Sequence, residues 1–191
     1  GGPSCLGEEP VTVAQHRDAS PYLDGSVSSD WNITRALRVL HLVRRTRACH
    51  AAALGPCQFS LEEIQPLVDA LISDELDRFE EWTWSGWPFG FDLRTEPTMR
   101  FWSLFVDTLW HDLDTTQHAL IADRMSDHID DFLANYHTPH WSLYNGNNWT
   151  PVLTKAALYW AITYFHEDPR AAEVVHRSLQ VLWLHREFYL P

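Results

Sequence analysis

The sequence feature that most constrains the fold is the stretch 141–165, which changes from a polar, aromatic loop into an apolar helix. Thr150 is a favourable N-cap residue, and Pro151 suits the first helical position, where a backbone N–H has no helical partner. A nearly unbroken apolar run follows over residues 152–162. Because a helix that is apolar on most sides is usually buried, this stretch predicts a protein in which several helices pack together.

Length and composition limit the class of protein. The 191 residues, 45% of them apolar, are enough for one domain with a real core. The formal net charge of −12 argues against a nucleic-acid partner, since nucleic-acid-binding proteins carry a basic face. No apolar run approaches the length that a membrane span needs. Ten tryptophans are far more than average usage gives, and they draw attention to the segments that carry them.

Several features predict a secreted protein. The chain begins Gly-Gly-Pro without a methionine, from which we expect that a leader was removed or that the chain was cut from a longer one. Asn32 and Asn148 each begin an N-glycosylation sequon. Three cysteines allow one disulfide and one remaining thiol, or one bond to another chain. A Cys49–Cys57 bond would close a short loop after a helix, and a Cys5–Cys57 bond is equally allowed.

The remaining sequence reads as an extended arm followed by helices. Residues 1–29 are rich in Gly, Pro, Ser and Asp and show no period, so we interpret them as an arm laid over the surface. Residues 30–191 form one helical domain, in which apolar residues recur at helical spacing and no segment reads as a strand. The expected helices cover approximately residues 31–54, 61–81, 95–113, 116–136, 151–165 and 169–189. The fold class is all-α.

Each expected helix has an apolar face. The faces of the second, fourth and sixth helices are predicted to include Leu61, Leu120, Leu179 and Trp183. Ser60 and Glu63 have the spacing of a capping box at the start of the second helix. His118 and His128 lie on or beside the fourth face, and we expect them to pair with nearby carboxylates. The arginines of the first helix are typical of a solvated face, with an acidic partner as the alternative.

Two aromatic segments interrupt the helices. Residues 82–91 (WTWSGWPFGF) hold three Trp, two Phe, two Gly and a Pro, which excludes a regular helix. Such rings can form a platform on which the C–H faces of sugars stack, with Trp84 and Trp87 as the candidates; the alternative is an aromatic plug between helices. Arg94 and Arg100 follow closely and would neutralise a carboxylate or sulfate beside that platform.

The second aromatic segment leads into the apolar helix. It offers neutral amides at 145–148 and flat rings at Trp141, Tyr144 and Trp149, a combination that suits a sugar chain. The alternative is a loop held by its own Asn turns. His140 follows His137 by three residues, but no third ligand is near, so we expect no metal and no other cofactor. Both aromatic segments lie at hairpin junctions, as they would on one rim of an (α/α) toroid.

The sequence from 144 to 191 resembles the catalytic toroid of heparinase II/III-like polysaccharide lyases. Residues 147–152 (NNWTPV), the Ala-rich helix and residues 167–173 (EDPRAAE) match that family's Asn-Asn-Trp segment, small-residue helix and acidic-Pro turn. The resemblance implies β-elimination on a uronic-acid polysaccharide. It implies Asn147 or Asn148 as the group that neutralises the uronate, with His140 as a second group. It also implies that Trp84, Trp87, Trp141 and Trp149 stack the polysaccharide.

The chain departs from the family in two places. Residues 153–156 (LTKA) replace the usual Cys-Asn-Gly-Gly, and the segment that carries the family's catalytic Tyr would follow residue 191. No base can therefore be assigned. A glycan on Asn148 would also crowd the proposed cleft. Six helices make about half of such a ring, so we expect an incomplete (α/α) toroid that a second chain or a C-terminal portion completes.

Two other classes of function remain open. One is a non-catalytic carbohydrate-binding or structural glycoprotein that has the toroid without the chemistry, which the −12 charge and the missing base favour. The other is a toroid glycoside hydrolase. That enzyme needs two carboxylates flanking a sugar, and Asp92 and Glu96 beside the Trp-rich segment are the candidate pair.

Overall fold

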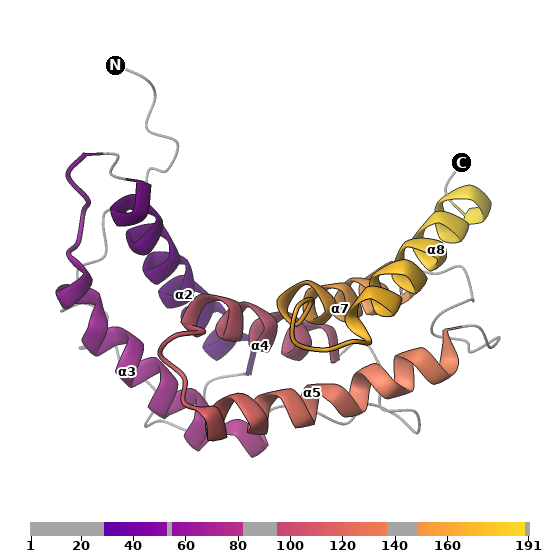
Figure 1. The fold of residues 1–191 in the computed structure, drawn as a ribbon, viewed down its shortest axis with the longest axis horizontal. Helices are drawn as coiled ribbons and strands as arrows, with labels where there is room; N and C mark the ends of the chain where they lie inside the picture. The colour runs from indigo at the N-terminus through magenta and orange to yellow at the C-terminus, as the bar shows by residue number, and fades with distance from the viewer. Residues whose placement is uncertain (1–28, 53–54, 82–94, 137–148, 190–191) are drawn as a thin grey trace. The chain divides into compact units, whose positions relative to one another are not determined.

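A computed structural model describes residues 29–52, 55–81, 95–136 and 149–189 of the chain (Figure 1). These residues form six α-helices and one short 3-10 helix, with no β-strand among them, so the all-α prediction is confirmed. The helices are α2 (Ser29–Ala52), α3 (Leu61–Asp77), α4 (Thr95–Leu109), α5 (Thr115–Asn135), α7 (Trp149–Thr163) and α8 (Ala171–Tyr189), with the 3-10 helix η1 at Phe79–Glu81. No helix within these ranges combines the length and the apolarity needed to cross a bilayer.

The chain divides into two compact units, residues 1–71 and residues 72–191. In the first unit, the predicted capping box begins α3. The Glu63 N–H donates to Ser60 Oγ over 3.1 Å, and the Ser60 N–H donates to Glu63 Oε2 over 2.7 Å. These two bonds satisfy backbone donors that the first turn of a helix leaves without partners.

A disulfide joins Cys49 at the end of α2 to Cys57 ahead of α3. The turn between them contains Gly55, whose φ of +106° is readily adopted only by glycine. The His50 ring also bonds through Nε2 to the carbonyl oxygen of Phe59, at 2.9 Å. Of the two pairings that the sequence allowed, the structure therefore has Cys49–Cys57.

In the second unit, α7 packs against both α4 and α8. Three contacts between α4 and α7, or between the residues that directly follow them, occur in the same order along both helices. Glu96 pairs with Lys155, the Ser103 carbonyl accepts a bond from Thr163 Oγ1 at 3.3 Å, and the ring of Trp110 meets that of Tyr164. Helices α4 and α7 therefore run parallel, whereas α8 folds back along α7 after a short turn.

Aromatic side chains form much of the core of this unit. Trp102 is fully buried on α4 and makes edge-to-face contacts with Phe79, Phe101 and Phe105, at centroid distances of 4.9–5.3 Å. Trp160 of α7 is buried as well. The prediction that residues 152–162 lie in a helix is confirmed, but its burial is partial. Leu153, Ala156, Ala157 and Trp160 are buried, whereas Lys155 and Ile162 are exposed.

Several helix boundaries differ from the prediction. Helix α4 ends at Leu109 rather than near 113, and Asp114 caps α5 in a second capping box with Gln117. Helix α7 begins at Trp149, so Thr150 lies inside the helix rather than capping it. Pro151 then stands at the third position of α7. It is tolerated there because the N–H groups of the first turn have no partner within the helix.

The predicted apolar faces are partly wrong. Leu61, Leu120, Leu179 and Trp183 are exposed rather than buried. On α8 the error has a clear cause, since its buried side is made of smaller and polar residues: Ala171, Val174, Ser178, Val181 and His185. The buried side of α7 is likewise rich in alanine. Small and polar side chains therefore form the buried side of α8, and on α7 alanines share the buried side with Leu153 and Trp160.

Trp160 and Trp183 are a matched pair for testing this packing, since both are helical tryptophans and are 1% and 59% exposed. Replacing Trp160 with Ala should lower the free energy of unfolding by about 3–5 kcal/mol, because it removes a large side chain from the core. Replacing Trp183 with Ala should lower it by less than about 1 kcal/mol. Urea denaturation followed by circular dichroism measures both; equal losses would contradict the orientation of α8.

The disulfide can be tested by peptide mapping, because trypsin cannot cut between Cys49 and Cys57. Digestion without reduction should release one peptide, residues 48–78, that is lighter by two hydrogen masses than its reduced form. A Cys5–Cys57 bond would instead link that peptide to an N-terminal one. Mass spectrometry of reduced and unreduced digests distinguishes the two pairings.

Candidate functional site

Most of the predicted sugar-handling residues lie outside the residues that the structure describes. They are Trp84, Trp87, Asp92, Arg94, His140, Trp141, Tyr144, Asn147 and Asn148. Of the predicted glycosylation sites, Asn32 falls within the first turns of α2. The structure describes Arg100, Trp149 and Glu96, and these belong to α4 and α7, the two parallel helices of the second unit.

The parallel packing of α4 and α7 determines where these residues gather. Because both helices run in the same direction, the chain enters both of them at the same end. The segment that leads into α4 contains the first aromatic cluster of the sequence, and the segment that leads into α7 contains the second. We call this end of the helix pair, marked by Glu96, Arg100, Trp149 and Lys155, the entry end.

A buried carboxylate organises the entry end. Glu96 is only 6% exposed, and its Oε1 lies 2.8 Å from Lys155 Nζ and 3.4 Å from Arg100 Nε. Both contacts are ion pairs without hydrogen-bond geometry. Burying a lone carboxylate carries a large desolvation cost, so two cations on one carboxylate explain how it is tolerated here.

This position of Glu96 bears on the glycoside hydrolase alternative. A general acid must reach the glycosidic oxygen of its substrate, to within hydrogen-bond distance. Glu96 is buried, and its Oε1 faces two cations of the protein. In this position Glu96 holds two cations of the protein, which weighs against its being the general acid of a glycoside hydrolase.

Trp149 occupies the first position of α7 and is partly exposed. Thr150 beside it is buried, and its carbonyl oxygen accepts a bond from Thr154 Oγ1 at 2.7 Å. The indole of Trp149 is therefore held at the entry end by the start of a well-packed helix.

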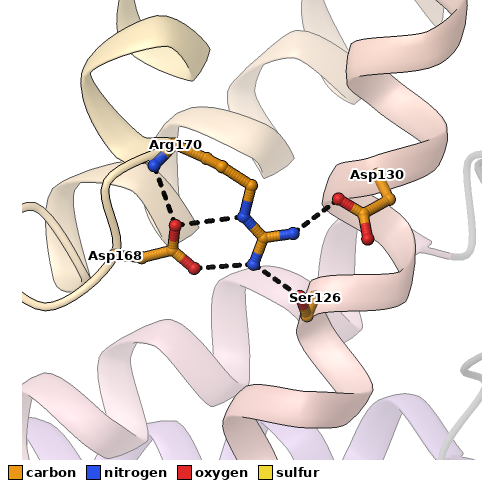
Figure 2. A network of polar contacts seen from close by, with 4 residues as sticks. All are labelled: Ser126, Asp130, Asp168 and Arg170. Atoms are coloured by element: carbon orange, nitrogen blue, oxygen red, sulfur yellow. Dashed lines mark hydrogen bonds and ion pairs between the residues drawn. The ribbon is translucent and has the colours of Figure 1, made fainter.

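A second polar cluster holds the opposite end of α7 (Figure 2). Arg170 bonds with Asp168 through its own backbone N–H (2.8 Å) and its guanidinium (2.6 and 3.0 Å). It also donates to Ser126 Oγ at 2.6 Å and pairs with Asp130, both on α5. Its guanidinium stands 5.7 Å from the ring centroid of Trp160. Arg170 thereby ties the turn before α8 to α5 and α7.

We expected His118 and His128 to pair with carboxylates, and the structure contradicts this for His118. His118 Nε2 bonds to the carbonyl oxygen of Trp110 at 2.9 Å and stacks near its ring, so its partner is a backbone group rather than a carboxylate. His128 is buried, and its pairing with a carboxylate stays a prediction. Burial raises the pKa of Asp131, and His128 partly opposes this rise. In the ranges that the structure describes, no group of three His, Cys, Asp or Glu residues could hold a metal ion.

Sequence reasoning missed Lys155 and Arg170. Lys155 had a usable signal, since it is the chain's only lysine among 14 basic residues. Arg170 follows Asp168 by two residues, the spacing at which an Asp side chain often bonds the backbone. The contacts of Lys155 with α4 and of Arg170 with α5, however, join residues more than 35 positions apart, and no local pattern predicts them.

Comparison with known proteins gives no assignment: no family model, no curated protein and no solved structure matches the chain.

The Arg170 cluster makes stability depend on pH in a defined direction. Hydrogen bonds from Arg170 lower the pKa of Asp168. A carboxyl whose pKa is lower in the folded state stabilises the fold above its unfolded pKa, about 3.9, and that stabilisation is lost as the pH falls through the folded pKa. Replacing Asp168 with Asn should therefore cost about 1–3 kcal/mol at neutral pH, and the cost should shrink below about pH 4.

Asp123, an exposed residue of α5, provides the control. Replacing Asp123 with Asn should change the free energy of unfolding little at any pH. Denaturant titrations of the three proteins at several pH values measure the difference. If the Asp168 variant lost the same amount of stability at pH 3 and pH 7, the ion pair would not be the cause.

Proposed function

We propose that this chain is a polysaccharide lyase-like protein that acts by β-elimination on a uronic-acid-containing polysaccharide. The observation that carries the proposal is the parallel packing of α4 and α7, because it makes the chain enter both helices at one end. Both aromatic segments would then contribute to one rim around a sugar chain. Arg100 and Lys155 at the same end supply the positive charge that an acidic sugar needs.

The proposed mechanism assigns roles by resemblance. Asn147 or Asn148 neutralises the uronate carboxylate, with His140 as a second group, and this acidifies the proton on C5. A base removes that proton, and the electron pair left on C5 forms the C4–C5 double bond as the C4–O bond breaks. The leaving sugar oxygen takes up a proton and departs as a hydroxyl. The chain supplies no assigned base. Stacking would come from the tryptophans of the rim: Trp84, Trp87, Trp141 and Trp149.

The wider setting follows from the same proposal. The helices would form part of an (α/α) toroid, completed by a second chain or a C-terminal portion. The disulfide between Cys49 and Cys57 supports a secreted protein, since such bonds persist in oxidising compartments. Of the two sequons, the one at Asn32 would carry a glycan there. A glycan on Asn148 would crowd the rim, so in the active protein we expect that site to be unmodified.

The second candidate is a carbohydrate-binding protein without catalysis. Two observations favour it: the net charge of −12, which disfavours the binding of dense polyanions, and the lack of an assigned base. This protein would use the same rim and the same cations. It differs from the lyase only in leaving the glycosidic bond intact.

Incubation with uronic-acid polymers separates the candidates. A lyase creates a double bond conjugated to the uronate carboxylate, so ultraviolet absorbance should increase with time and with each new chain end. Binding without new absorbance, detected by affinity electrophoresis, would mean the non-catalytic protein. New reducing ends without absorbance would mean a hydrolase. If the protein neither bound nor cleaved any acidic or neutral polysaccharide, the proposal would be wrong.

A further inference from the structure

Among the residues of the entry end that the structure describes, two side chains carry the positive charge. Lys155 is the only lysine of the chain, and its side chain is 47% exposed; the side chain of Arg100 is 36% exposed. Both contact the same oxygen of buried Glu96. Two positive charges against one negative charge leave a local surplus of one positive charge, in a chain whose net charge is −12.

This surplus is available to a ligand. Within the ranges that the structure describes, Arg100 and Lys155 make no ion pair or hydrogen bond other than those to Glu96. The contacts with Glu96 lack hydrogen-bond geometry, so they hold the cations by charge and leave their outer N–H groups able to donate elsewhere.

The arrangement leaves a cost that a ligand can offset. Two cations stabilise the buried carboxylate but repel each other, because both stand close to the same oxygen of Glu96. An anion placed between the outer faces of Arg100 and Lys155 would offset this repulsion.

We propose that Arg100 and Lys155, held together by Glu96, form an anion subsite that binds one acidic group of a polysaccharide, either a carboxylate or a sulfate. This subsite rests on the proposed function for its ligand class. Arg100 contributes a planar guanidinium that can bind two oxygens at once, and Lys155 contributes a compact charge. Glu96 is a positioning residue that keeps the two cations side by side.

The direct experiment compares charge-matched variants of the whole chain. Lys155→Gln and Arg100→Gln should each weaken binding about tenfold at low salt, because each removes a charged hydrogen-bond donor. Arg124→Gln provides the control, since it removes the same charge from a side chain that is 38% exposed and pairs with Glu80. Binding is measured by calorimetry with a non-sulfated polyuronate and with a sulfated glycosaminoglycan. The polymer whose affinity falls further identifies the acidic group.

The single lysine allows a second measurement that a purely structural role would not affect. An amine-reactive reagent can modify only Lys155 and the amino terminus, so mass spectrometry measures how accessible the Lys155 amine is. Bound polymer should slow acetylation of Lys155 severalfold and leave the amino terminus unaffected. Lys155→Arg keeps the charge and should restore most of the affinity, which separates lost charge from lost folding.

The outcomes for the subsite and for the proposed function are distinct. If the unmodified chain binds polymer while Lys155→Gln and Arg100→Gln bind as tightly as Arg124→Gln, and Lys155 is not protected, the subsite is wrong and the function stands. If no acidic polymer binds the unmodified chain, both are wrong. Should Lys155→Gln fail to fold, protection of Lys155 and the affinity of Lys155→Arg decide the question.

Discussion

The parallel contact between α4 and α7 is the constraint on which the second unit depends. Apolar burial on the two helices stabilises this unit, since Trp102, Phe105 and Trp160 are each worth about 1.5–3 kcal/mol when removed from water. The same contact carries Glu96 out of solvent. A buried carboxylate without partners would cost more than one such side chain returns, so Lys155 and Arg100 must accompany it. The apolar packing of the two helices therefore requires that the two cations stand beside Glu96.

The presence of the helices was predictable because the spacing of apolar residues and the positions of helix-breaking residues are local features of the sequence. The Ser60 capping box was also predicted from four consecutive residues and is confirmed by its two hydrogen bonds. The start of α7 was predicted one or two residues too late, because Thr150-Pro151 fits a cap and also fits the first turn, where unpaired N–H groups are normal. The Asp114–Gln117 box has the same spacing as the first one, and its signal was present in the sequence.

Which side of a helix is buried was less predictable than the helix itself. On α8 the largest apolar residues, Leu179 and Trp183, are exposed, whereas Ser178 and Ala171 are buried. Apolar size suggests burial only when the neighbouring helix has room for it, and that depends on residues elsewhere in the chain. The Glu96–Lys155 pair likewise joins residues that are far apart in the sequence, so no local pattern predicts it. The amides at 147–148, which the sequence predicts to be at the centre of the site, lie outside the described residues, so their role rests on resemblance.

The charge distribution limits the polysaccharide that such a site can prefer. A protein with a net charge of −12 repels a polyanion at long range, but this repulsion is screened beyond about 8 Å at physiological ionic strength. The contact region then decides, and there the surplus is a single positive charge shared by Arg100 and Lys155. One surplus positive charge can neutralise one acidic group of a ligand. A densely sulfated polysaccharide would bring several further negative charges close to a protein that is itself acidic. Under the proposed function, the electrostatics therefore favour a polymer whose acidic groups are widely spaced.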